Sequence, residues 1–81
     1  MTKVFGDRVE VLSFKGQPVR FSWRGRWRGI RQVIDSWREM GCWWKGEGEK
    51  VFFRVEADNG GIYEIYYEPS SKNWRLYRLY D

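Results

Sequence analysis

The part of the sequence best suited to chemistry is residues 21–29, FSWRGRWRG, where arginines alternate with aromatic residues and glycines. Guanidinium groups bind phosphate oxygens and indole rings stack on nucleobases, so this composition is typical of surfaces that bind nucleic acid. The same residues also fit a β-hairpin with buried indoles and solvated arginines. We therefore expect a hairpin in which Phe21 and Trp23 help to build the core while the arginines face outward.

The charge around this segment is strongly one-sided. No acidic residue lies between Glu10 and Asp35, whereas this interval holds six basic residues. Residues 1–34 carry eight Lys and Arg against two acids, and residues 35–81 carry seven against nine, so the net charge of +4 is concentrated in the first half. Such segregation predicts a basic patch that faces an anionic partner. The alternative is that glutamates of the second half lie alongside and neutralise it.

Further tryptophans extend the set of candidate residues. Trp43 and Trp44 are adjacent, and side chains that are neighbours in an extended segment point to opposite faces, so we expect one of these indoles to be exposed. Trp23 alternates with Val19 and Phe21 and is expected to face the core with them. The residues predicted to bind nucleic acid or a partner are Arg20, Arg24, Arg26, Trp27, Arg28, Arg31, Trp43 and Trp44.

Catalytic and metal-binding motifs are not found. The sequence contains no histidine, which removes the commonest general base and the commonest metal ligand. Cys42, the single cysteine, therefore has no imidazole to activate it, and a Ser–His–Asp triad is impossible. Glu47 and Glu49 lie in a glycine-rich segment and are interpreted as solvated turn residues, and no phosphate-binding glycine loop is present. We expect a protein that is not an enzyme, with no cofactor and no metal site.

The same features bear on location. A single cysteine excludes an intramolecular disulfide and fits a reducing compartment. Residues 1–11, MTKVFGDRVEV, lack the apolar run of a signal peptide, and no apolar run in the sequence could span a bilayer. We expect a cytoplasmic protein with no membrane partner.

The pattern of the whole chain predicts one all-β domain over residues 1–81. Short alternating runs separated by glycines favour five to six antiparallel strands in a small barrel or a strongly curved meander. Residues 74–80, WRLYRLY, are apolar on both faces, which suits closure of a barrel. Residues 30–40 also show apolar residues at helical spacing, yet Trp27, Ile30, Val33 and Ile34 fit a strand with a bulge as well. We expect a strand to about Ile34 and then an irregular turn or a single helical turn near 35–40, with an α+β fold as the alternative.

Two hairpins are predicted in detail. Residues 51–67 form one with a three-residue loop at 59–61, Asn-Gly-Gly. This register pairs apolar residues on one face: Ala57 with Tyr63, Val55 with Ile65, and Phe53 with Tyr67. The other, more hydrated face carries Arg54, Glu56, Glu64 and Tyr66. In the second hairpin, a loop at 24–26 would make Trp23 and Trp27 cross-strand neighbours, and other loop lengths remain open.

The order of Trp, Arg and Tyr positions resembles a family of small bacterial domains of unknown function. It is carried by PVRFSWRGRWRGIRQVIDSWRE, WWKGEGEKVFFRVEADNGGIYEIYYEP and WRLYRLYD. Such domains occur alone, or near or fused to proteins related to the Y-family translesion DNA polymerases. The family has no established active-site residues to carry over. The resemblance implies an accessory role in DNA damage tolerance, through contact with DNA or with a polymerase-like protein.

Together these features predict a non-catalytic module that binds DNA or another nucleic acid through the hairpin at 20–31, with contacts to phosphates rather than to specific bases. The alternative is a protein-interaction module that docks on a translesion-polymerase-like partner through Trp43, Trp44 and nearby arginines. An aromatic cage for a cationic peptide also fits an aromatic-rich barrel, but the basic patch would repel such a ligand.

Overall fold

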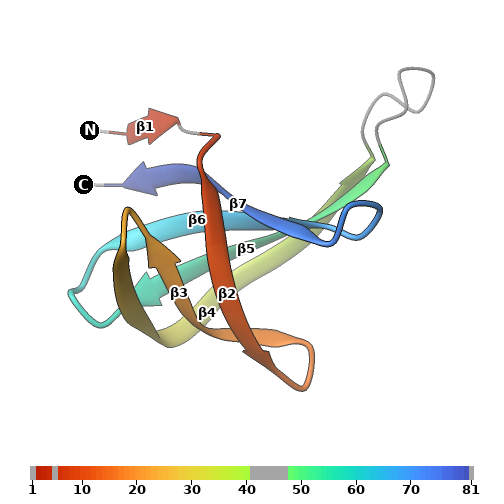
Figure 1. Ribbon diagram of the computed structural model, residues 1–81. Coiled ribbons are helices and arrows are strands. Elements are labelled where there is room, and N and C mark those ends of the chain that lie inside the picture. Colours follow the sequence, from red (N-terminus) through yellow and green to blue (C-terminus); the bar gives the residue numbers. More distant parts are fainter. Residues whose placement is uncertain (1, 5, 41–47, 81) are drawn as a thin grey trace.

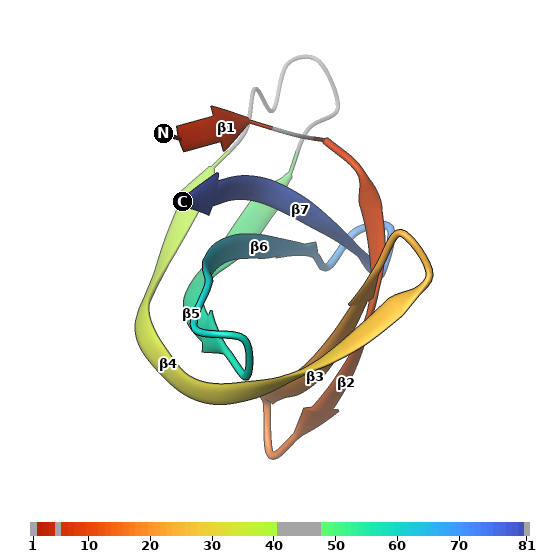
Figure 2. The same cartoon turned by 90° about the vertical axis from the view of Figure 1, so that its left-hand side faces the viewer.

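The domain is built entirely from β-strands in the residues that the structure, a computed structural model, describes: 2–4, 6–40 and 48–80 (Figure 1). The strands are β1 (Thr2–Val4), β2 (Arg8–Phe14), β3 (Gln17–Trp23), β4 (Arg26–Met40), β5 (Glu49–Ala57), β6 (Ile62–Glu68) and β7 (Asn73–Tyr80). From β2 to β7 each strand pairs antiparallel with the next, and β7 returns to pair with β2. The predicted small antiparallel barrel is therefore confirmed, with six strands in the ring (Figure 2).

The barrel closes along a short seam between its first and last strands. Among the described residues, two pairs join β2 to β7, namely Arg8 with Arg75 and Val9 with Trp74. A hydrogen bond of 2.8 Å from the Leu76 amide to the Asp7 carbonyl continues the seam. Beyond it, β1 pairs with the last residues of β7 and extends the same edge (Figure 1).

The interior of the barrel is filled by aliphatic and aromatic side chains that alternate along the strands. The buried cluster consists of Val9, Phe21, Phe53, Val55, Ala57, Tyr63, Ile65 and Leu76. Phe21 is fully buried and meets Tyr63 edge-on, with 5.0 Å between the ring centres. Trp23 packs against this cluster and donates a hydrogen bond from its indole nitrogen to Asp7. The inward placement of Phe21 and Trp23 is as predicted.

Val19 does not share this inward face, because β3 is irregular beside it. The pairing of β2 with β3 shifts so that Leu12 lies opposite Arg20 and Ser13 lies opposite Pro18. Val19 is thus an extra residue in a β-bulge, and it is exposed, whereas Pro18 is buried. The prediction that Val19 faces the core was wrong for this reason.

Residues 30–40 are strand throughout, so the helical turn near 35–40 and the α+β alternative were both wrong. β4 contains two bulges, at Arg31 and at Ile34, because its pairing with β5 shifts at these positions. The residues that pair with the inward-facing side of β5 are therefore three apart: Ile30, Val33 and Ser36, opposite Ala57, Val55 and Phe53. Each bulge lengthens the strand repeat locally from two residues to three. Helical spacing in the sequence was thus produced by a bent strand.

The hairpin of β5 and β6 has its loop one residue earlier than predicted. Gly60, with φ of 83°, takes the left-handed position, and the Ala57 amide donates to the Gly61 carbonyl at 2.9 Å. The loop is therefore 58–60, which moves every pair by two residues: Val55 lies opposite Tyr63, Phe53 opposite Ile65, and Val51 opposite Tyr67. A shift of two preserves the faces. Asp58, the first residue of the loop, contacts β4, because its amide donates a hydrogen bond to the Gly29 carbonyl.

The turn between β3 and β4 is tighter than the 24–26 loop that was considered. Arg24 and Gly25 both have positive φ, 53° and 78°, as a two-residue type I′ turn requires. Trp23 therefore pairs with Arg26, and Ser22 pairs with Trp27. The two tryptophans are not cross-strand neighbours, because directly opposed residues share a face and Trp27 is one position out of phase with Trp23.

This turn yields a stability prediction. Gly25→Ala places a side chain in the left-handed region, which is unfavourable by about 1–2 kcal/mol for an L-residue, although no atom lies within 4 Å of the added Cβ. We expect the midpoint of urea unfolding to fall accordingly. Gly6→Ala is the matched control, because its Cβ also meets nothing within 4 Å and its φ is not positive. Equal losses in the two variants would contradict the turn geometry.

Candidate nucleic-acid interface

The arginine hairpin, residues 17–31, presents its basic side chains on two faces. Cross-strand pairing places Arg28 opposite Phe21 and Arg26 opposite Trp23, so these two arginines share the face that carries core residues. Arg20 and Trp27 lie on the other, outward face of the same hairpin, because they pair with Gly29 and Ser22. The structure thus splits the predicted patch into two groups.

Two of the predicted arginines are held by acids. Arg24 lies 3.8 Å from the Asp7 carboxylate and stacks over the Trp23 ring at 4.5 Å. Arg31 lies 3.9 Å from Glu56 and donates a hydrogen bond to the Asp58 carbonyl at 3.1 Å. The alternative to the predicted patch, that glutamates of the second half lie alongside it, therefore holds for Arg31.

The remaining hairpin arginines are open. Within the described ranges, Arg20, Arg26 and Arg28 form no salt bridge and no hydrogen bond. Trp27 is 44% exposed, which leaves part of its indole in solvent. Arg20 and Arg26 are exposed and Arg28 is half-buried, so these arginines and Trp27 are the part of the predicted site that remains available to an external partner.

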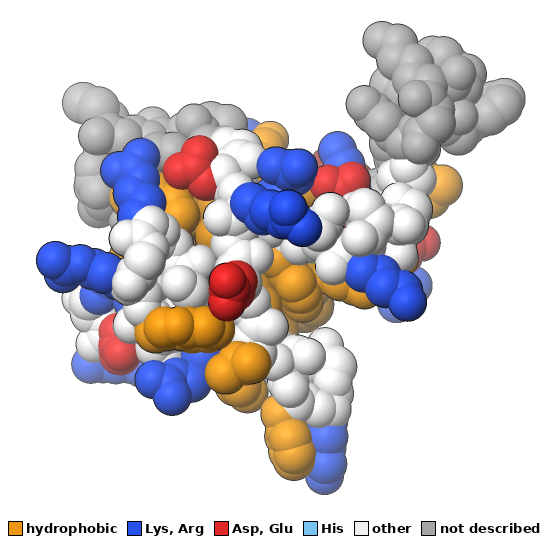
Figure 3. Space-filling view, viewed as in Figure 1, with side chains coloured by type: hydrophobic (Ala, Val, Ile, Leu, Met, Phe, Trp, Pro, Cys, Tyr) orange, Lys and Arg blue, Asp and Glu red, His pale blue; other side chains and the backbone are white. Residues whose placement is uncertain are grey.

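An exposed apolar row adjoins Arg20 and was not predicted. Leu12, directly opposite Arg20, is 52% exposed, and Phe14 at the end of the same strand is 65% exposed. Figure 3 shows hydrophobic side chains on the β2–β3 hairpin with basic side chains beside them. The signal in the sequence was the alternation of Glu10, Leu12 and Phe14, which places all three on one face of β2.

The outer faces of β5, β6 and β7 carry a second aromatic layer. Phe52 points away from the barrel interior, yet it is only 4% exposed. Trp37 stacks parallel to it, with 5.4 Å between the ring centres, and Tyr77 meets it edge-on at 5.3 Å. This layer makes the β5–β7 side of the barrel two layers thick in side chains.

Glu64 lies buried within this layer, which corrects its predicted place on the hydrated face. It is 1% exposed, and its carboxylate accepts hydrogen bonds from Arg54 at 2.9 Å and from the Tyr80 hydroxyl at 2.7 Å. The bond to Glu64 raises the pKa of Arg54 further above its ordinary value, so the guanidinium stays charged. Arg54 also lies over the rings of Trp37 and Tyr80. The buried carboxylate of Glu64 therefore has an ion-pair partner and a second hydrogen-bond donor within the barrel.

Trp43 and Trp44 lie outside the described residues, and so does Cys42. In the part of the chain that is described, no three His, Cys, Asp or Glu side chains gather as a metal site would require. No helix there is long and apolar enough to cross a membrane.

Comparison with known proteins gives one result. The searches of curated proteins and of solved structures found no match. The sequence model of the family described as Domain of unknown function (DUF6504) matches residues 1–81. Since that match covers every residue of the sequence, the chain belongs to the DUF6504 family.

Proposed function

We propose that the domain is a non-catalytic module that binds nucleic acid through the arginine hairpin. The observation that carries the proposal is that three arginines of the hairpin form no salt bridge or hydrogen bond with any described residue. Arg20 lies with the half-exposed Trp27 on the outward face, and Arg26 and Arg28 lie on the other face of the same hairpin. Guanidinium groups form charge-assisted hydrogen bonds with phosphate oxygens. Phosphate binding there would not have to break an ion pair between these three arginines and any described acid.

The surrounding acids support this assignment. Asp7 and Glu56 form salt bridges with the hairpin arginines Arg24 and Arg31. The Asp58 carboxylate accepts the Gly29 amide at 3.0 Å. Glu10 lies opposite Ser22 on the outward face but forms no salt bridge with Arg20. The face of Trp27 offers a stacking surface worth about 1–3 kcal/mol per base.

A salt titration tests the proposal. We expect short single-stranded or duplex DNA to quench the tryptophan fluorescence, with an affinity that falls steeply as salt rises. Replacing Arg20, Arg26 and Arg28 together by alanine should reduce the slope of log affinity against log salt by about 2–3, because each phosphate contact contributes about 0.7–0.9.

A control variant with the same loss of charge separates a local from a general effect. Arg8→Ala, Arg38→Ala and Lys72→Ala combined remove three positive charges elsewhere on the described surface and should leave most of the affinity and slope. Absence of binding at low salt would overturn the proposal, and equal losses in the two triple variants would overturn the assignment to the hairpin.

The exposed apolar row favours a second function, docking on a protein. Leu12, Phe14 and Trp27 are exposed beside Arg20, and aromatic residues with arginine are enriched at protein interfaces. Given the resemblance noted above, a translesion-polymerase-like protein is the partner we propose, with an accessory role in DNA damage tolerance. Binding through this row should change little with salt, which distinguishes it from phosphate binding.

A further inference from the structure

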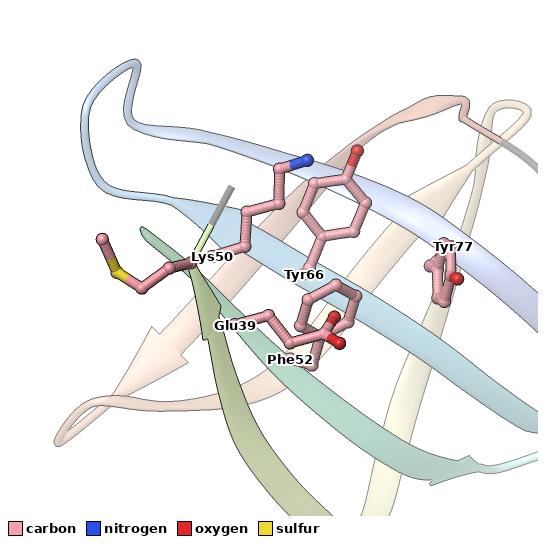
Figure 4. A pocket seen from close by; sticks show the side chains of 6 residues that line it. Glu39, Lys50, Phe52, Tyr66 and Tyr77 are labelled. Atoms are coloured by element: carbon pink, nitrogen blue, oxygen red, sulfur yellow. The ribbon is translucent and has the colours of Figure 1, made fainter. Parts of the chain in front are cut away.

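A pocket on the outer side of the barrel lies away from the arginine hairpin, at the far end of β4. It has a volume of about 260 Å³. The tyrosine pocket, as we call it, is lined in the described residues by Glu39, Met40, Lys50, Phe52, Tyr66 and Tyr77 (Figure 4). Four strands supply these side chains, so the barrel itself holds them in place.

Three aromatic rings form the base and walls of the pocket. The ring centre of Phe52 lies 5.1 Å from that of Tyr66 and 5.3 Å from that of Tyr77. The two tyrosine rings are 6.2 Å apart and inclined at 80° to each other. A flat ligand can therefore stack on one tyrosine while it presents its edge to the other, which are the two favoured geometries of aromatic contact.

Opposite charges stand at the rim without pairing. Glu39 and Lys50 are directly opposed on β4 and β5, yet no salt bridge joins them. Lys50 instead places its ammonium 5.4 Å from the centre of the Tyr66 ring. The Glu39 carboxylate, which extends toward Phe52 in Figure 4, has no hydrogen-bond or ion-pair partner among the described residues. The rim thus offers one strong acceptor and one strong donor to a ligand.

We propose that the tyrosine pocket binds a single unpaired guanine base of the nucleic acid that the domain is proposed to bind. Guanine carries ring and amino N–H donors that fit a carboxylate, and O6 and N7 acceptors that fit an ammonium. Its two-ring system provides a broad face for stacking on tyrosine. The inference rests on the proposed function, and it adds a preference for one base and for a single strand.

The chemistry of the rim disfavours other ligands. Thymine and uracil lack an exocyclic amino group for Glu39, and adenine lacks a carbonyl oxygen for Lys50. Cytosine has both groups but only one ring. A cationic ligand would meet the resident ammonium of Lys50 over Tyr66 and the guanidinium of Arg78, which lies 4.9 Å from the centre of Tyr77.

The pocket can be tested without DNA, by titrating guanosine 5′-monophosphate into protein labelled with ¹³C at the methionine methyl groups. The sequence has two methionines, and Met40 lines the pocket, so a stacked base should shift the Met40 signal through its ring current. The Met40→Leu variant assigns that signal. Uridine 5′-monophosphate should bind at least about tenfold more weakly, and Glu39→Gln should weaken the guanine nucleotide by about 10-fold or more.

Each outcome decides one question. No shift of Met40 with the guanine nucleotide, or equal affinities for the two nucleotides, would overturn the pocket proposal. An unchanged affinity in Glu39→Gln would overturn the role of the carboxylate and with it the base preference. The variant without Arg20, Arg26 and Arg28 should keep the Met40 response while it loses salt-dependent DNA binding. If the unmodified protein binds no DNA but still shows the Met40 response, the proposed nucleic-acid function is contradicted and the pocket for the guanine nucleotide is not.

Discussion

Phe21→Ala is expected to destabilise the domain by about 3–5 kcal/mol, because it removes a fully buried ring and leaves a cavity in the core. The edge-on contact of Phe21 with Tyr63 at 5.0 Å is lost as well. A domain of this size has a total stability of about 4–12 kcal/mol, so the substitution should remove a large fraction of it. Urea unfolding followed by tryptophan fluorescence measures the loss.

Val19→Ala is the matched control on the same strand. Val19 is 41% exposed at the bulge, and substitutions at exposed sites usually change stability by less than about 0.5 kcal/mol. A large loss at Val19 with a small one at Phe21 would mean that β3 lacks the bulge and that the faces are those expected from simple alternation.

Tyr80→Phe is expected to lower stability by about 1.5–3 kcal/mol, the usual contribution of a hydrogen bond to a charged group. The Tyr80 hydroxyl donates to Glu64 at 2.7 Å, and Glu64 is 1% exposed, so water does not replace the lost donor. Arg54 remains as the partner of the carboxylate, which limits the loss. The free energy of unfolding in urea at neutral pH gives the value.

Tyr67→Phe serves as the control for removal of a phenol. Its hydroxyl makes no hydrogen bond with any described residue, so we expect a change within about 0.5 kcal/mol. If Tyr80→Phe were equally mild, the carboxylate of Glu64 would have to be hydrated in solution, in disagreement with its burial.

The fold was largely predictable, because apolar residues that recur every second position along a strand indicate which side chains face the barrel interior. The alternation in β5 and β6 placed Phe53, Val55 and Ile65 inward, and the faces survived a shift of the loop by one residue. Bulges were harder to predict. The two in β4 arise from pairing with β5, and the resulting three-residue spacing of Ile30 and Val33 is the same in a short helical segment.

The site was predictable in composition but not in arrangement. Which arginines are open depends on where Asp7 and Glu56 lie after folding, and these acids reach Arg24 and Arg31 from other strands. The burial of Glu64 was missed because a charged residue between apolar ones usually faces solvent. Its cover comes from an aromatic layer on the outer face, which alternation within single strands does not reveal.

The seam between β2 and β7 also has a consequence for folding. Every other junction of the ring joins strands that follow one another in the chain, so those hairpins close small loops. The seam joins Arg8 to Arg75, and its two pairs form only after nearly the whole chain has lost its freedom. We therefore expect closure to be a late step of folding, and we expect the same seam to be the first place where the ring opens when the native state fluctuates.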